Sequence, residues 1–159
     1  MSESQIIKAS ELMALPARKA VRCVLEELRN ERRTVPVKRR PLERMRFWLV
    51  IDLHAEILNG GVSQYFTNSY GRDYQAAMIA LEDVGANEQL KIIKAWLNII
   101  PDGTDPADCV AMQDLVSASE AIREASRALT EQYARALDSF YSVVRLYIVQ
   151  HYYAFDCVV

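Results

Sequence analysis

Residues 56–71 read Glu-Ile-Leu-Asn-Gly-Gly-Val-Ser-Gln-Tyr-Phe-Thr-Asn-Ser-Tyr-Gly, and this stretch decides how the chain is divided. Glycine, uncharged amides and aromatic residues gather here, and they interrupt a sequence whose pattern is otherwise helical. Asn59 followed by Gly60 and Gly61 is typical of a helix C-terminus with a left-handed cap residue. We therefore expect a long helix to end at about residue 58 and the chain to turn directly after it.

The rest of the chain favours helix. Its 159 residues are 51% hydrophobic, enough for one globular domain with a sizeable core. All five glycines lie between positions 60 and 103 and only five prolines are present, so long tracts lack helix breakers. Alternation typical of strands is hard to find. The sequence predicts an all-α fold, a single compact bundle of about seven helices over residues 1–159.

The expected helices follow apolar periodicity and capping residues. Residues 1–41 form a basic N-terminal helical arm and linker, and Pro41 opens a central helix that is apolar nearly all round from Phe47. Beyond Pro106 there is neither Gly nor Pro, which predicts one long helix with a break near Asp138 and Ser139. The expected spans are about 3–15, 16–31, 41–58, 73–84, 88–100, 106 to between 136 and 140, and 142 onward.

Cysteine and histidine usage argues against several classes of protein. Cys23, Cys109 and Cys157 are odd in number and lack paired spacing, as expected in a reducing compartment. They form no ligand spacing with His54 and His151, so we predict no metal. No apolar run approaches ~18 residues, and the N-terminus lacks an apolar leader. We expect a cytoplasmic protein without a membrane span.

Charge is distributed unevenly along the chain. Residues 1–46 hold 12 Lys/Arg and 6 Asp/Glu, a balance of +6, whereas residues 47–159 hold 7 and 15, a balance of −8. A basic arm that precedes an acidic body indicates a charged partner or self-association.

Carboxylates in rows can imitate the phosphates of a DNA duplex. On a continuous helix Glu120, Glu124, Glu131 and Asp138 share one face, but Arg127 lies on the same row and would neutralise them through i, i+3 and i, i+4 pairs. Carboxylates with fewer basic neighbours lie in two loops. We take these as the candidate partner-binding residues: Glu82, Asp83, Glu88, Asp102, Asp105 and Asp108.

The stretch 56–71 itself has two interpretations. As a site, its polar residues form a patch at a helix terminus that grips a ligand or a partner's backbone: Glu56, Asn59, Gln64, Tyr65 and Asn68. As structure, its amides satisfy loop backbone groups, while the other residues turn the chain (Gly60, Gly61), cap a short helix (Ser63) and pack inward (Tyr65, Phe66). Loop geometry alone explains every residue type, so we favour the structural interpretation.

The usual catalytic arrangements are missing. Asp52 and Glu56 stand at i, i+4 with His54 between them, and such a pair would share a metal or act as acid and base. No Glu-x-x-His partner accompanies them, so a solvated or partner-facing stripe is favoured. His151, among tyrosines, fits a core histidine. We predict no catalytic residues, no cofactor and no enzyme activity.

Nucleic-acid binding is the alternative function. The basic segment 32–46 would contact phosphates, but aromatic residues for base stacking are absent until Phe47 and Trp48, and the acidic remainder of the protein would repel nucleic acid. A solvated linker is therefore favoured. The residues that would make the contacts are Arg32, Arg33, Lys38, Arg39 and Arg40.

The wording Glu56…Asn59-Gly60-Gly61-x-Ser63-Gln64-Tyr65-Phe66-x-Asn68-Ser69-x-Gly71 resembles the bacterial DNA-mimic-protein family. The similarity continues through Ala77, Ala80-Leu81 and Val84-Gly85-Ala86. It ends with Leu137-Asp138-x-Phe140-Tyr141, Tyr147 and His151, and so covers roughly residues 43–151.

The resemblance implies a compact all-helical bacterial protein, often a homodimer and without catalytic activity. The family's namesake uses surface carboxylates to occupy the DNA-binding face of a transcriptional regulator, so a regulator or another basic protein is the implied partner. This chain departs from the namesake in its near-neutral net charge and its basic arm. The fold therefore carries over more firmly than the mimicry, because function belongs to the surface.

Overall fold

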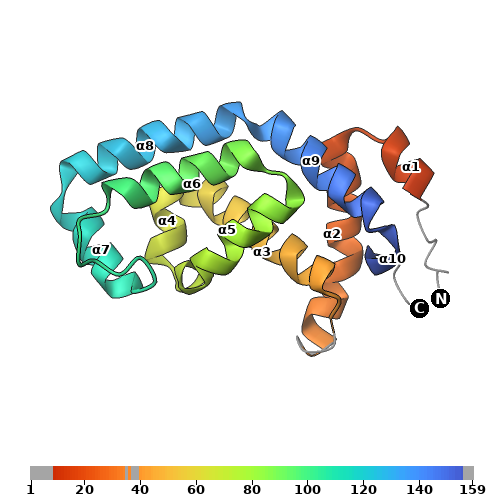
Figure 1. Ribbon diagram of the computed structural model, residues 1–159, viewed down its shortest axis with the longest axis horizontal. Helices are drawn as coiled ribbons and strands as arrows, with labels where there is room; N and C mark the ends of the chain where they lie inside the picture. The colour runs from red at the N-terminus through yellow and green to blue at the C-terminus, as the bar shows by residue number, and fades with distance from the viewer. Residues whose placement is uncertain (1–8, 35, 37–39, 156–159) are drawn as a thin grey trace.

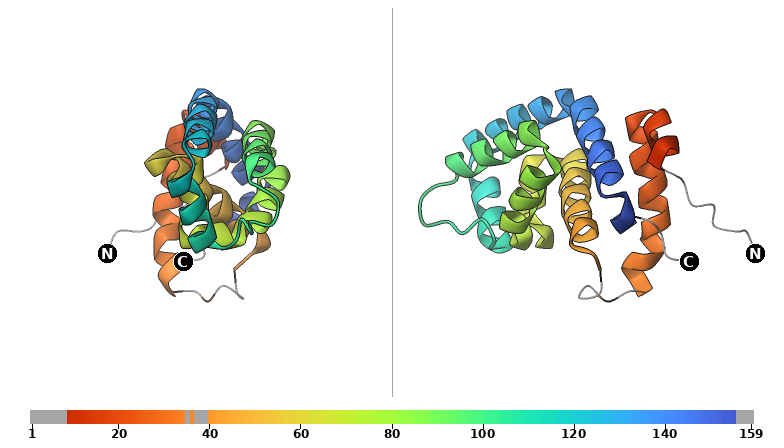
Figure 2. Two further views of the ribbon diagram at one scale, coloured as in Figure 1. Left: turned by 90° about the vertical axis from the view of Figure 1, so that its left-hand side faces the viewer. Right: turned by 45° about the vertical axis from the view of Figure 1, so that its right-hand side comes forward.

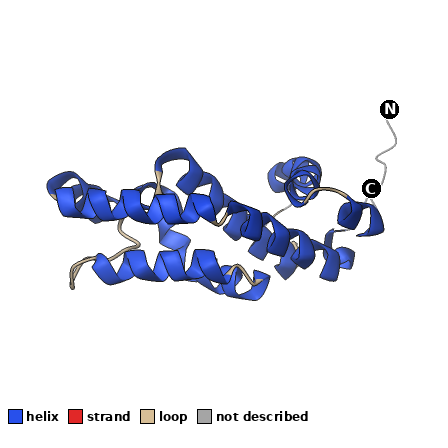
Figure 3. Ribbon diagram, turned by 90° about the horizontal axis from the view of Figure 1, so that it is seen from above, coloured by secondary structure: helices blue, strands red, loops and turns tan. Residues whose placement is uncertain are grey.

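The computed structural model describes residues 9–34, 36 and 40–155, and the side chains of residues 30–32 and 34 lie outside that description. The predicted all-α class is confirmed, with no strand among the described residues (Figure 3). These residues form ten α-helices rather than about seven, together with the 3-10 helix η2. The elements are α1 (Ala9–Ala14), α2 (Ala17–Thr34), α3 (Leu42–Gly60), α4 (Val62–Thr67), η2 (Ser69–Asp73), α5 (Tyr74–Val84), α6 (Asn87–Ile99), α7 (Cys109–Ala118), α8 (Glu120–Arg135), α9 (Leu137–Gln150) and α10 (Tyr152–Phe155).

The central position predicted for α3 is confirmed. Its side chains Phe47, Val50, Leu53 and Ile57 are at most 1% exposed, and the helix packs against α4, α5, α8 and α10. The ring of Phe47 meets that of Phe155 edge to face, with centroids 5.6 Å apart. A helix that is apolar on nearly every side is stable only when it is surrounded, and the neighbours of α3 provide that cover.

Four further helices, α2, α6, α8 and α9, form the frame of the molecule. α8 and α9 follow one another along one side of the molecule, α6 runs beside α8, and α2 packs against α9 (Figures 1 and 2). The ends of the chain are tied to this frame by arginines. Arg145 on α9 donates to the carbonyl of Leu15, 2.8 Å away, and Arg44 on α3 donates to the carbonyl of Ala154. The molecule is elongated, with α7 at one end and α1 and α2 at the other (Figure 1).

The expectation of one long helix from Pro106 to about 136–140 is wrong, because serine and aspartate side chains end and restart the helix without Gly or Pro. Asp108 accepts hydrogen bonds from the backbone N–H groups of Val110 and Ala111 and so starts α7, three residues after Pro106. Ser119 accepts from the N–H of Ile122 and starts α8. Both are standard N-cap contacts, which satisfy donors that have no partner within the helix.

The break expected near Asp138 and Ser139 lies instead at Ala136. This residue leaves helical geometry at φ −96° and ψ 14°, and its carbonyl accepts a hydrogen bond from Nε2 of the fully buried Gln89 at 3.0 Å. The buried side-chain amide of Gln89 on α6 thus satisfies the carbonyl of Ala136 at the bend. Asp138 consequently belongs to α9, and the row from Glu120 to Asp138 is not continuous.

The N-terminal predictions are tested only in part. Residues 3–8 of the first expected helix lie outside the described residues, and 9–14 are helical. α2 extends to Thr34, so the linker is shorter than expected. Cys23 and Cys109 are free and partly buried, while Cys157 lies outside the described part. Within that part, no helix combines the length and the apolar character needed to cross a membrane.

Candidate functional site

The polar residues of the stretch 56–71 meet one another across the turn from α3 to α4. Oε2 of Glu56 accepts hydrogen bonds from Nε2 of Gln64 at 3.2 Å and from Nδ2 of Asn68 at 2.6 Å. The amides thus bind a side-chain carboxylate rather than the loop backbone groups that we expected. Asn59 is exposed and takes no part in this network.

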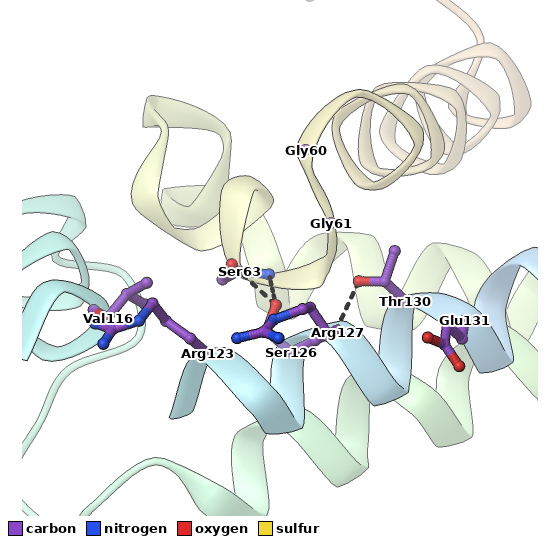
Figure 4. A pocket seen from close by; sticks show the side chains of 9 residues that line it. All are labelled: Gly60, Gly61, Ser63, Val116, Arg123, Ser126, Arg127, Thr130 and Glu131. Atoms are coloured by element: carbon purple, nitrogen blue, oxygen red, sulfur yellow. Dashed lines mark hydrogen bonds between the residues drawn. The ribbon is translucent and has the colours of Figure 1, made fainter. Parts of the chain in front are cut away.

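The start of α4 is held by hydroxyls of α8, and Figure 4 shows the contact between Ser63 and Ser126. The N–H of Val62 donates to Oγ1 of Thr130 at 3.0 Å, and the N–H of Ser63 donates to Oγ of Ser126 at 3.1 Å. The sequence suggested that Ser63 caps this helix, but the capping hydroxyls come from another helix, α8. Gly61 makes the turn at φ +90° and ψ 175°, a conformation available to glycine that is not the left-handed helical cap we expected.

Gly71 brings η2 against the backbone of α4. A Cβ atom at this position would lie 2.8 Å from Cα of Phe66 and 3.0 Å from its carbonyl oxygen. Tyr65 and Phe66 are buried, as predicted, at 2% and 0% exposure. The stretch therefore behaves as a structural junction of α3, α4, η2 and α8, which agrees with the structural interpretation.

A groove of about 440 Å³ lies beside Gly60 and Gly61 (Figure 4). Two arginines of α8 line it, and both are engaged elsewhere. Arg123 binds Oε2 of Glu120 at 2.6 Å, and Arg127 binds its Oε1 at 2.8 Å. The groove thus presents small hydroxyls whose hydrogen bonds serve the junction, with no unpaired charge or nucleophile to mark it as a site.

His54 is engaged by two tyrosines, and Glu56 is engaged by Gln64 and Asn68. Nδ1 of His54 lies 3.1 Å from the hydroxyl of Tyr133, and Nε2 lies 2.9 Å from that of Tyr141. The imidazole stacks on Phe140 at 4.1 Å. Burial, with a smaller contribution from the charge of Arg18, lowers the pKa of His54 from 6.5 to about 4. Among the described residues no three His, Cys, Asp or Glu side chains are grouped to hold a metal.

The two predicted acidic loops lie at opposite ends of α6. Glu82 and Asp83 end α5 and Glu88 begins α6, whereas the other loop joins α6 to α7 (Figure 1). The 13 residues of α6 separate them by about 20 Å. Asp83 is also neutralised, because its Oδ2 lies 2.7 Å from Nε of Arg46. These six carboxylates therefore do not form one surface.

The loop before α7 extends into a larger acidic surface than the sequence suggested. Asp114 is exposed on α7, one helical turn from Val110, which is 61% exposed. From Ala95 to Ile122 the chain contains no Lys, Arg or His, a signal that would have identified Asp114. We call four exposed aspartates the acidic lobe, and none of them has an ion pair within the described part of the chain: Asp102, Asp105, Asp108 and Asp114.

Two carboxylates of α8, Glu120 and Glu131, are neutralised, but through other pairs than expected. Arg127 reaches back seven residues to Glu120 instead of pairing with Glu124 or Glu131, and Glu131 contacts Arg135 at 3.5 Å. Glu124 is exposed. An imitation of phosphates requires unpaired charge, so Glu120 and Glu131 are poor candidates for that role.

The basic segment is only partly described. The side chain of Arg33, near the C-terminus of α2, is exposed, and that of Arg40 is half-buried. Lys38, Arg39 and the side chain of Arg32 lie outside the described part. Nucleic-acid binding by this segment stays a prediction.

Replacing Gly71 with alanine is expected to destabilise the protein by about 1–3 kcal/mol, because the added methyl group meets backbone that cannot rotate away. Gly103→Ala is the matched control. Its φ is +88° with no atom within 4 Å of the added Cβ, so it costs only the dihedral strain, about 1 kcal/mol. Urea unfolding measures both free energies. A Gly71→Ala variant no less stable than Gly103→Ala would contradict the junction described above.

The buried His54 is expected to make stability depend on pH. Its pKa in the folded protein, about 4, lies below 6.5, so the unfolded chain binds this proton first. The stabilisation, up to about 3 kcal/mol, is complete above pH 6.5 and is lost as the pH falls towards 4. In His54→Gln the unfolding free energy should fall less over this range than it does in the wild-type protein. An equal fall in the variant and the wild-type protein would show that His54 is not the group responsible.

A protein-family model matches the chain, whereas no curated protein and no solved structure matches it. The family model described as DMP19-like protein matches residues 39–151, more than two thirds of the chain. These residues include the junction of α3, α4 and η2, the acidic lobe and α8. The chain therefore belongs to the family of DMP19-like proteins, a DNA-mimic family.

Proposed function

We propose that this protein is a non-enzymatic interaction module of the DNA-mimic type, which binds a basic, DNA-binding protein partner through the acidic lobe. The observation that carries the proposal is the run of residues 95–122, which has no basic side chain. Its aspartates are exposed and form no ion pair with described residues. Unpaired carboxylates are what an imitation of phosphates requires, because a neutralised carboxylate attracts no cationic side chain.

Local hydrogen bonds favour this role by holding the lobe in place. Oδ1 of Asp105 accepts from the N–H of Ala107 at 2.9 Å, and Asp108 caps α7. Nε2 of Gln113 on α7 donates to the carbonyl of Thr67 at 2.8 Å. A surface whose charges are fixed before binding loses less conformational entropy when a partner docks.

The exposed side chain of Val110 adds an apolar contact among the aspartates. It sits one turn before Asp114 on α7, so both face solvent on the same side of the helix. Partner-binding surfaces commonly combine a desolvated apolar centre with a polar rim. The α5–α6 loop is the weaker candidate, since Asp83 is paired and Lys91 and Lys94 follow on α6.

Neutralising the lobe is expected to abolish capture of a basic partner. The variant Asp102→Asn/Asp105→Asn/Asp114→Asn keeps the acceptor oxygen of residue 105 and leaves the cap Asp108 intact. In a nuclease-treated lysate of the source organism, the wild-type protein should retain a DNA-binding protein that duplex DNA displaces, and the triple variant should bind it at least about tenfold more weakly.

The control removes the same number of charges elsewhere. Asp73→Asn/Glu124→Gln/Asp138→Asn alters three exposed carboxylates that have no ion pair within the described chain, and it should leave affinity unchanged. A partner lost equally from both variants, or lost only with Glu82→Gln/Glu88→Gln, would refute the assignment to the lobe. Association into a homodimer is a further proposal, tested by light scattering of the purified protein.

A further inference from the structure

A second charged feature, of opposite sign, lies on α2 at the end of the molecule away from the acidic lobe (Figure 1). Three arginines at positions 18, 22 and 29 line a cavity of about 330 Å³ together with one residue each from α3 and α9, Ile51 and Tyr141. The spacings of four and seven residues place the arginines on one face of α2. The cavity lies near the lower end of the size range of small-molecule sites.

The charge in this cavity is unbalanced. Glu26 is the single carboxylate among the lining residues, and its Oε1 is already bound to Nε of Arg22 at 2.9 Å. Arg18 and Arg29 form no ion pair with any described residue. Three guanidinium groups and one carboxylate give the cavity a net charge of +2 in a protein whose overall charge is −2.

One wall of the cavity is rigid. The guanidinium of Arg18 lies over the ring of Tyr141, 5.4 Å from its centroid. That ring is fixed from behind, because its hydroxyl binds Nε2 of the buried His54 at 2.9 Å and Phe140 packs against it at 5.4 Å. The floor is apolar and also comes from packed side chains: Val21, Leu25 and Ile51.

We propose that this arginine pocket binds a compact polyanion, a small molecule that carries two or more phosphate or carboxylate groups. Planar guanidinium groups bind both chemistries through paired N–H donors, and two of the three, those of Arg18 and Arg29, form no ion pair with any described residue. The site is independent of the acidic lobe, with which it shares no residue.

Isothermal titration calorimetry with pyrophosphate and with tricarballylate tests the pocket, at an ionic strength of about 0.01 M, where charges are screened only over about 30 Å. Saturable binding of pyrophosphate alone identifies phosphate chemistry, binding of tricarballylate alone identifies carboxylate chemistry, and binding of both identifies a general polyanion site. Arg18→Gln and Arg29→Gln should each weaken binding about tenfold. Arg72→Gln, an exposed arginine on η2, should not.

Glu26 provides a test of opposite sign. Glu26→Gln removes the lone carboxylate and frees Arg22, so affinity should rise about tenfold, whereas Asp73→Asn leaves it unchanged. In the double variant Arg22→Gln/Glu26→Gln the gain should disappear. Absence of saturable binding by both probes, equal weakening by Arg72→Gln, or no gain from Glu26→Gln overturns the proposal. Circular dichroism checks that each variant, altered only at an exposed side chain, stays folded.

Discussion

The turn held by the carboxylate of Glu56 is the constraint on which the other parts of the molecule depend. Glu56 binds the amides of Gln64 and Asn68, and hydrogen bonds to a charged acceptor contribute about 1.5–3 kcal/mol. This fixes α4, whose Phe66 packs 6.0 Å from the ring of Trp96 on α6. The carbonyl of Thr67, at the end of α4, then receives Gln113 of α7. The stretch 56–71 thus positions α7, which carries Asp114 of the acidic lobe and begins directly after Asp108.

The helical class and the central helix could be predicted, because both follow from apolar periodicity and from where Gly and Pro lie. Helix boundaries that depend on side-chain contacts could not. Ser119 ends one helix and caps the next, whereas Ser117 and Ser126 lie within α7 and α8, so the presence of a serine does not by itself mark the boundary. The bend at Ala136 coincides with a hydrogen bond from Gln89, 47 residues away, which no local pattern encodes.

The same limit applies to the candidate surfaces. Charge counts identified the two acidic loops, but only the fold shows that α6 separates them and that Arg46 neutralises Asp83. Asp114 was not among the predicted residues, because its exposure depends on which face of α7 packs inward. Among the arginines, the sequence drew attention to residues 32–46, whereas packing against Tyr141 singles out those earlier on α2. Proximity in space, rather than local composition, selects these residues.

Family membership establishes the scaffold, while the partner depends on side chains at its surface. The central claim is that residues 56–71 are structural and that contact with the partner is made by the acidic lobe. Hydrogen–deuterium exchange of the protein with and without its captured partner tests this most directly. We predict slower exchange on binding for amides of residues 102–114, and no change for 60–64 beside the groove of Gly60 and Gly61. Protection confined to residues 60–64, with 102–114 unchanged, would contradict it.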